Sequence, residues 1–415
     1  MPIPMLLGFL LGLPAADPAT VDTAHRLARL ESEIALLRGS RDAAAIAALE
    51  GIRIDSLTQE TIGQGTVEAG HDGKYFLRTT DGRWRVNVDG QIQVRYTTAR
   101  RDSADDQWRG GFETRRARIE LSGNVFDQDW RYRVRMAADR SDGSFVLEDA
   151  HLERRLGSGW SSRFGQFKAP FFHEHNLSSK RALAVDRSLV SNSFSQGRTQ
   201  GAELAWAGDV TAFSVSLNDG FGGENISALQ RDVDWALTAR AELLAAGQWE
   251  RFSDFTSAPD EEGLAVLVGG AAHVQKGESG TIDAEESLSS WTIDAAAEWP
   301  GAAVALAFVG RHMEEADTDQ FGFCAQGGVY VTDDIEVLAR YEWADADEVG
   351  ADDLSIITIG ANRYMRGHAL KLTADAGYAM GSVADFFTFG GGGWRADEPG
   401  EDGQLVVRVQ LQLLF

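Results

Sequence analysis

Long runs in which apolar and polar residues alternate are the feature that most restricts the fold of this chain. In the first run, one face carries Trp84, Val86, Val88, Ile92, Val94 and Tyr96. Arginine, glutamine and aspartate occupy most of the intervening positions. Because successive strand side chains point to opposite faces, the run predicts a strand with one apolar and one polar side. Its length exceeds that of most globular strands and suits a tilted transmembrane β-strand, which needs roughly 9–11 residues.

The same period of two returns along the rest of the chain. It is clear at 115–125, 130–136, 233–243, 291–299, 370–378 and 404–415. Short turns such as Pro300-Gly301 join some of the runs, and longer polar loops such as 169–197 and 381–402 join others. Alternating short and long connections predict an up-and-down barrel with turns on one rim and loops on the other.

The length of the patterned region sets the expected strand number. Residues 84–415, at roughly 20 residues per strand and connection, accommodate about 16 strands. A direct count gives 17, an odd number, whereas single-chain bacterial barrels are built from even numbers of strands. We expect the surplus strand at 246–256 or 263–275. We therefore predict an all-β fold, a transmembrane antiparallel β-barrel of about 16 strands, with 18 as the alternative.

A soluble β-sandwich or propeller is the competing interpretation of the alternation. Two features favour the membrane barrel. Arginines recur at alternate positions on the polar faces of long strands, and aromatic residues such as Trp84, Tyr96, Trp291 and Trp299 stand at the ends of apolar faces, as in the girdles of outer-membrane barrels. No apolar run of about 18 residues follows residue 16, which excludes a bundle of membrane-spanning helices in that region.

Charge and cysteine content exclude several classes of function. The net charge is -24, which makes the chain a poor non-specific binder of nucleic acid. The charge is unevenly distributed: residues 1–200 hold 28 Lys and Arg against 26 Asp and Glu, whereas residues 201–415 hold 11 against 37. One cysteine, Cys324, excludes internal disulfides and CxxC metal sites.

Catalytic and metal-binding motifs are weak in this sequence. His173, Glu174 and His175 form an HxH pair without a third ligand at helical or hairpin spacing. There is no GxSxG elbow and no phosphate-binding P-loop. We therefore predict no metal, no cofactor and no enzymatic activity.

The N-terminal part differs from the rest. Residues 1–19 contain a short apolar run followed by small residues and are interpreted as a signal peptide, although no Lys or Arg precedes the run. Leu27, Leu30, Ile34 and Leu37 follow heptad spacing, so 20–60 is predicted to be a periplasmic coiled-coil helix. An amphipathic helix lying on its own domain is the alternative. Residues 61–80 are interpreted as a linker and 81–415 as the barrel.

Three segments resemble a known family. Residues 115–135 (RRARIELSGNVFDQDWRYRVR), 146–155 (VLEDAHLERR) and 164–171 (FGQFKAPF) resemble segments of the phosphate-selective porin O and P family. Residues 321–343 and 357–372 look like its later strands, and Phe415 resembles the terminal aromatic of outer-membrane barrels.

The resemblance implies a 16-stranded barrel in the outer membrane of a Gram-negative-type bacterium. It also implies a homotrimer that passes small anions, with loop 169–197 folded into the lumen as a constriction. The phosphate-specific members owe their preference to basic residues at the constriction and the mouths. Here only 5 of 39 basic residues are lysine, and the second half of the chain is acidic, so the resemblance indicates a porin more directly than a phosphate preference.

If the apolar faces meet lipid, the polar faces line the lumen. The predicted anion pathway is Arg83, Arg85, Arg95, Arg116, Arg118, Arg131, Arg133 and Arg135. The cations expected on the constriction loop are Lys168, Lys180, Arg181 and Arg187. The alternative is that these arginines pair with nearby acids, among them Glu120, Glu148 and Asp149, and the sequence leaves this open.

The predicted function is passive diffusion of small hydrophilic solutes, including anions such as phosphate, through a water-filled lumen. A cation-preferring general porin and a structural or adhesive barrel are the alternatives. The expected partners are small anionic solutes, outer-membrane lipid, lipopolysaccharide and further copies of the chain, but not nucleic acid. Acidic segments such as 260–262 are expected in external loops.

Overall fold

The computed structural model describes residues 67–102, 108–227, 233–277, 287–345, 353–388, 390–397 and 402–415. The predicted signal peptide and coiled-coil helix lie outside these residues. Within them, no helix is long and apolar enough to cross a membrane.

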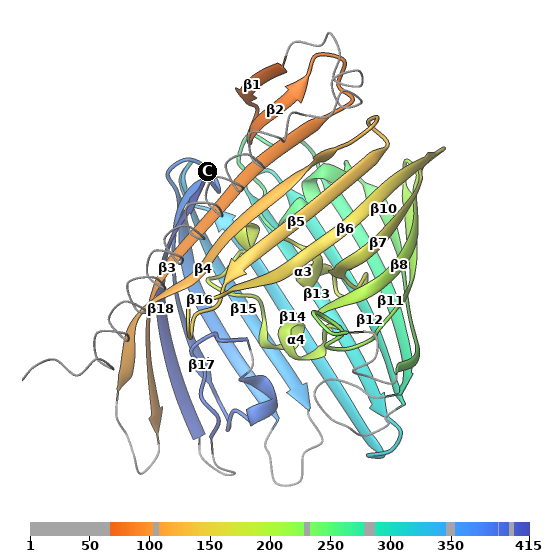
Figure 1. Ribbon diagram of the computed structural model, residues 1–415. Coiled ribbons are helices and arrows are strands. Elements are labelled where there is room, and N and C mark those ends of the chain that lie inside the picture. The colour runs from red at the N-terminus through yellow and green to blue at the C-terminus, as the bar shows by residue number, and fades with distance from the viewer. Residues whose placement is uncertain are drawn as a thin grey trace, which may run out of the picture. The chain divides into compact units, whose positions relative to one another are not determined.

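Antiparallel strands β3 to β18 form a closed barrel of 16 strands (Figure 1). Each strand pairs with the next in the chain, and β18 pairs with β3 to close the ring. Two short strands precede the barrel, β1 Val67–His71 and β2 Tyr75–Thr79. The first eight barrel strands are β3 Arg85–Asp102, β4 Arg109–Asn124, β5 Trp130–Ala138, β6 Phe145–Gly157, β7 Trp160–Lys168, β8 Arg198–Ala207, β9 Thr211–Asn218 and β10 Val233–Ala246. The others are β11 Ala265–Gly277, β12 Leu288–Trp299, β13 Ala302–Met313, β14 Thr318–Tyr330, β15 Ile335–Asp345, β16 Leu354–Tyr364, β17 Leu370–Ala379 and β18 Asp402–Leu414.

The predicted number of 16 barrel strands is confirmed, and the surplus strand of the direct count is identified. Residues 265–277 form β11, whereas 247–264 contain the short 3-10 helix η2 (Trp249–Ser253). This segment is the one long connection on the turn rim, the rim that otherwise carries the short connections between described strands. The acidic residues 260–262 therefore lie at the turn rim. The prediction that they lie in an external loop is wrong.

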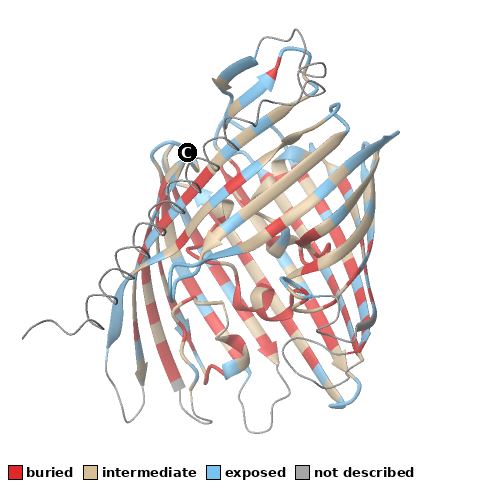
Figure 2. Ribbon diagram, viewed as in Figure 1, coloured by how far each residue is buried: buried red, intermediate tan, exposed pale blue. Residues whose placement is uncertain are grey.

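The two faces of the wall follow the predicted alternation (Figure 2). Along β12, burial alternates residue by residue, with Trp291 and Ile293 exposed on the outer face and Thr292 and Asp294 buried inside. In β3 the predicted apolar face, including Val86, is exposed on the outside of the barrel. An apolar outer face next to lipid and a polar inner face next to water or protein explain the period of two.

The linker interpretation of 61–80 is wrong for its described part, because β1 and β2 form a hairpin there. β18 ends where Phe415 exchanges main-chain hydrogen bonds with Gly90, with N···O distances of 3.1 and 2.6 Å. Beyond that point β2 takes over the same edge of β3, with Tyr75 opposite Val88. The hairpin thus satisfies backbone groups of β3 that β18 is too short to reach. Gly90 leaves room for the terminal side chain, because an added Cβ at this position would meet the Phe415 ring.

The outward orientation of Ile293 generates a stability prediction. Its side chain lies near the middle of β12 and is 59% exposed on the outer face. Ile293→Arg should lower the free energy of unfolding from lipid vesicles by about 2–4 kcal/mol, because a charge then faces the bilayer core. Val331→Arg, at an exposed turn-rim position, is the control and should change it little. Equal losses in both variants would contradict the orientation of β12.

Candidate pore and its constriction

Loop 169–197, between β7 and β8, lies inside the barrel (Figure 1). It contains the short helices α3 (His173–Asn176), η1 (Ser179–Arg181) and α4 (Leu189–Phe194). The placement of the loop follows from its partners, because strands around most of the ring contact it.

Wall side chains donate hydrogen bonds to the main chain of the loop. Arg95 of β3 donates to the carbonyl of Val185 at 3.1 Å, and Arg240 of β10 donates to that of Phe171 at 2.9 Å. Asn362, Lys371 and Gln412, on β16 to β18, donate at 2.8–2.9 Å to the carbonyls of Leu183, Ala182 and Lys180, respectively. A chain segment that crosses a barrel has no strand partner, so these bonds satisfy its buried backbone groups.

Asp186 is the main ionic attachment of the loop. Its carboxylate lies 2.7 Å from Arg116, 2.9 Å from Arg95 and 3.2 Å from Arg115, and it is 3% exposed. Burial alone would raise the pKa of this carboxyl, but the three guanidinium charges outweigh burial and hold its pKa well below the usual range. The wall thus binds the loop through a carboxylate that stays ionised.

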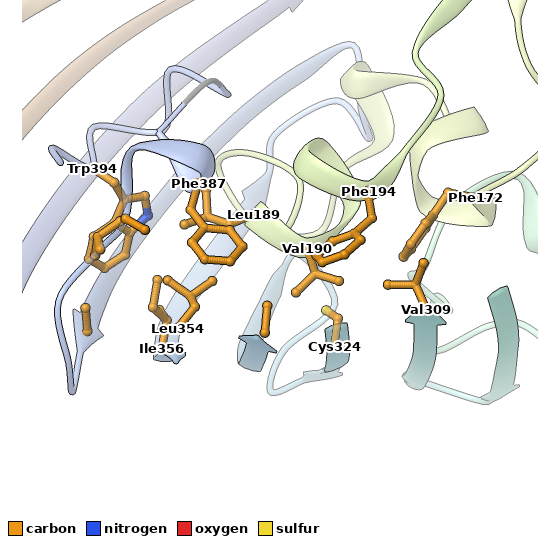
Figure 3. Packing of buried hydrophobic residues seen from close by; sticks show 14 of the residues in the cluster. Phe172, Leu189, Val190, Phe194, Val309, Cys324, Leu354, Ile356, Phe387 and Trp394 are labelled. Carbon is orange, nitrogen blue, oxygen red and sulfur yellow. The ribbon is translucent and has the colours of Figure 1, made fainter. Parts of the chain in front are cut away.

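Helix α4 packs its apolar side against the wall formed by the later strands, among them β13, β14 and β16 (Figure 3). Leu189, Val190 and Phe194 lie over Val309, Cys324, Leu354 and Ile356 of the strands below them. Phe387 and Trp394, from the loop between β17 and β18 that contains the 3-10 helix η3 (Asp385–Phe387), join the same cluster. Apolar protein therefore fills the lumen in front of the later strands.

The connection 247–264 adds a second apolar cluster from the turn rim. Phe252 and Phe255 are buried against Leu183 and Ala184 of the constriction loop and against inward residues of β10, β11, β12, β13 and β15. Loop and connection therefore meet inside the barrel, and the water-filled space is displaced toward the earlier strands.

Two adjoining cavities remain along this wall. The inner cavity, of about 670 Å³, lies between the constriction loop and strands of the β4–β10 wall. The rim cavity, of about 490 Å³, lies at the turn-rim ends of β3 to β7. Arg133, His151 and Arg163 line both cavities. Together the linings contain eleven lysines and arginines and five aspartates and glutamates, so the space is rich in positive charge although the whole chain is strongly acidic.

Four of the predicted pathway arginines hold structure through acids or loop atoms. Arg95 and Arg116 bind Asp186, as described above. Arg118 binds Glu148 and donates to the Ser179 hydroxyl at 2.6 Å. Arg135 binds both Glu120 and Asp149. For these positions the structure favours the paired alternative over an open ladder of charges.

The other four predicted arginines are placed differently. Arg131 lines the rim cavity, and Arg133 lines both cavities with a side chain that is 43% exposed. Arg85 lines the rim cavity and binds Asp72 at 2.7 Å. Arg83 is exposed and precedes β3, in the connection from β2, so it lies outside the barrel wall.

The loop cations also divide into two groups. Lys180 and Arg181 line the inner cavity, where Lys180 binds Asp89 at 2.9 Å and Arg181 bonds to Ser253. Lys168 donates to the carbonyls of His175 and Leu177, and Arg187 donates to those of Glu174 and Leu177. Burial, with the nearby charge of Arg116, lowers the pKa of Arg187 to about 10. Lys168 and Arg187 thus brace the fold of the loop, and Lys168 also lines the inner cavity.

Sequence reasoning missed three residues of this region. Lys74 of the hairpin turn enters the inner cavity and lies 3.1 Å from Glu120, but its segment was interpreted as a linker. Arg163 lies on the polar face of β7, and the period of two could have identified it. Asp186 carried no signal, because nothing in the order of residues shows which wall a loop acid will meet.

His173, Glu174 and His175 point to different partners. His173 lies 3.5 Å from Glu242, and His175 lies 2.9 Å from the Ser195 hydroxyl. Glu174 accepts from Ser188. Among the described residues no group of three or more His, Cys, Asp or Glu is arranged to hold a metal ion.

The Asp186 cluster generates a second prediction. Asp186→Asn leaves three guanidinium groups without their shared carboxylate and should lower the free energy of unfolding by about 3–5 kcal/mol at pH 7. Because the folded pKa is depressed, this stabilisation is present above the ordinary carboxyl pKa of about 3.9 and is lost only as pH falls through the lower folded value. Denaturant unfolding measures both effects. Asp334→Asn, which breaks an exposed pair with Arg363, is the control and should cost less than about 1 kcal/mol.

His175 generates a third prediction, in which stability also falls as pH falls, but over a higher pH range than for Asp186. Burial, reinforced by Arg187 and Lys168, lowers the pKa of this imidazole well below its ordinary value. As pH falls below about 6.5, the unfolded chain binds a proton that the folded chain does not, so stability should fall by up to about 1.4 kcal/mol per pH unit. His175→Asn should flatten this slope, measured by unfolding at several pH values. An unchanged slope would show that His175 is not the group responsible.

Comparisons with known proteins agree with this geometry. The model of the family "Phosphate-selective porin O and P" matches residues 86–322. An uncharacterised protein of Aquifex aeolicus is 22% identical over 375 residues, covering 80% of this chain and 87% of that protein.

Solved porins share the fold. The anion-selective porin of Comamonas acidovorans has a TM-score of 0.55 and 15% identity, covering 80% of this chain and 99% of that one. OmpF of Salmonella typhi has a TM-score of 0.53 and 13% identity, covering 80% and 98%. The family match spans more than half of the chain, and the barrel is that of a channel and not of an enzyme. The chain belongs to the phosphate-selective porin O and P family and is an outer-membrane porin.

Proposed function

We propose that this porin passes small hydrophilic solutes with a preference for anions, phosphate among them, along the wall formed by the earlier strands. The observation that supports the proposal is the charge of the two cavities, where eleven basic side chains stand against five acidic ones. Basic rings and ladders favour anions in a pore. Screening limits each charge to about 8–10 Å at physiological salt, so the preference should arise where the cavities are lined most closely by arginine.

A cation preference is the second candidate, because a third cavity has the opposite charge. This cavity of about 770 Å³ lies at the turn rim under the connection 247–264. Its lining contains six carboxylates, including Asp254, Glu298 and Asp333, with Arg251 and His368 as its basic groups. Solutes that followed this side of the rim would meet negative charge.

We also propose a homotrimer in contact with outer-membrane lipid and lipopolysaccharide. Support for a trimer comes from the trimer form of OmpT of Vibrio cholerae. That protein has the same fold, with 14% identity and a TM-score of 0.50, covering 79% of this chain and 98% of that one. Chemical cross-linking of the refolded protein in detergent would test it. A ladder that stops at the monomer would exclude the trimer.

Ion selectivity generates the fourth prediction. Under a KCl gradient across a planar bilayer, the reversal potential of the refolded protein should show a preference for chloride, and added phosphate should reduce the chloride current. Arg131→Ala and Arg133→Ala should each lower the anion preference about twofold or more, because both side chains face the cavities. Arg363→Ala, at an exposed pair on the turn rim, is the matched control and should leave it unchanged.

Two other results of the bilayer measurement would contradict the anion proposal. A preference for potassium would overturn the anion proposal and favour the acidic cavity as the route. Folded protein that forms no channels would favour a structural or adhesive barrel.

A further inference from the structure

The junction of the inner and rim cavities is lined by three nitrogen-bearing side chains from adjacent strands. Arg133 comes from β5, His151 from β6 and Arg163 from β7, and these three residues line both cavities. Arg133 lies directly opposite His151 in the strand register, and Arg163 lies opposite Glu153, two positions farther along β6. A solute that passes between the cavities therefore meets these three side chains together.

The hydrogen bonding of His151 determines the role of its free nitrogen. Nδ1 lies 3.3 Å from the main-chain oxygen of Gln166. A carbonyl oxygen only accepts, so Nδ1 carries the hydrogen and donates. In the neutral ring Nε2 is then an acceptor with a lone pair. The ring also lies edge-on to Phe167, at 6.5 Å between centroids, which restricts its rotation.

The two arginines keep donors for a solute. Arg133 approaches Glu120 only to 3.6 Å, and its side chain is 43% exposed. Arg163 is bound to Glu203 at 2.7 Å through Nη2 and lies over the Phe167 ring at 4.2 Å. The Arg163 side chain lines both cavities, with its Nε buried beneath the surface. The junction thus offers guanidinium donors on two sides and one imidazole acceptor between them.

We propose that His151 makes this junction selective for oxyanions that carry a hydroxyl group. Hydrogen phosphate, hydrogen carbonate and phosphate monoesters in their singly protonated form present charged oxygens to Arg133 and Arg163 and an O–H to Nε2 of His151. Sulfate presents acceptors only, so its oxygen faces the imidazole lone pair without a proton between them. A site built to bond a hydroxyl discriminates against an analogue that lacks it, because its own polar group is left unpaired. The inference rests on the proposed anion pathway and names the residue that selects within it.

Phosphate and sulfate give a direct test at about pH 8.5, where both ions carry two negative charges. Bi-ionic reversal potentials across a planar bilayer should show hydrogen phosphate preferred over sulfate on the order of fivefold, the contribution of about one hydrogen bond. His151→Phe, which keeps a flat ring but removes the acceptor, should bring the ratio to about one while chloride stays preferred over potassium. His151→Gln, whose amide oxygen accepts, should retain a larger ratio than His151→Phe.

Controls separate this inference from the anion proposal. His312→Phe removes an imidazole at the loop-rim end of β13, where it is paired with Asp319, and should leave the phosphate-to-sulfate ratio unchanged. Arg163→Gln should weaken passage of phosphate and sulfate alike. Equal permeability of the two ions in the wild type, or an unchanged ratio in His151→Phe, would overturn the role of His151. If the wild type showed no preference for chloride under the KCl gradient, the anion pathway itself would be contradicted. That measurement is independent of the phosphate-to-sulfate ratio.

Discussion

A loop that crosses the inside of a barrel must satisfy its backbone polar groups without a neighbouring strand, and much of the inner wall answers this requirement. Each buried carbonyl and N–H of loop 169–197 that faces the wall needs a partner. Arginine, lysine, asparagine and glutamine reach the carbonyls from β3, β10, β16, β17 and β18. Glu342 and Asp375 accept from N–H groups of Leu189 and Val185, respectively. Asp186, between three arginines, is the ionic centre of this arrangement.

This requirement divides the inward arginines into two sets with different roles. Arg95 and Arg116 neutralise Asp186 and face no open water, so they add little to the field in the conduit. Arg131, Arg133 and Arg163 lie farther toward the turn rim and line the rim cavity, which no residue of the loop lines, so their charges face open space. The position of the loop thus decides which charges a solute meets, and the net charge of the chain does not.

The period of two predicted the parts of the structure that depend on which face a residue occupies. It gave the orientation of β3 and β12, the barrel and its strand number, and the inward side of most pathway arginines. It could not predict partners, because a face does not specify whether Arg118 meets an acid or water. The hairpin β1–β2 was missed because five-residue strands are too short to show a period, and its pairing depends on where β18 ends. The placement of loop 169–197 in the lumen was implied only by the resemblance.

The sites that hold the loop come from strands at both ends of the chain, which has a consequence for the order of assembly. Val185 is held by Arg95, 90 residues before it, and Lys180 is held by Gln412, 232 residues after it. Contacts of such sequence separation form only after the loop-closure entropy of the intervening chain has been overcome. The lumen therefore acquires its final packing when β18 reaches β3, so ring closure and ordering of the loop form one late cooperative step. Before that step, the backbone hydrogen bonds between β3 and β18 and the contacts that hold the loop in the lumen are both incomplete.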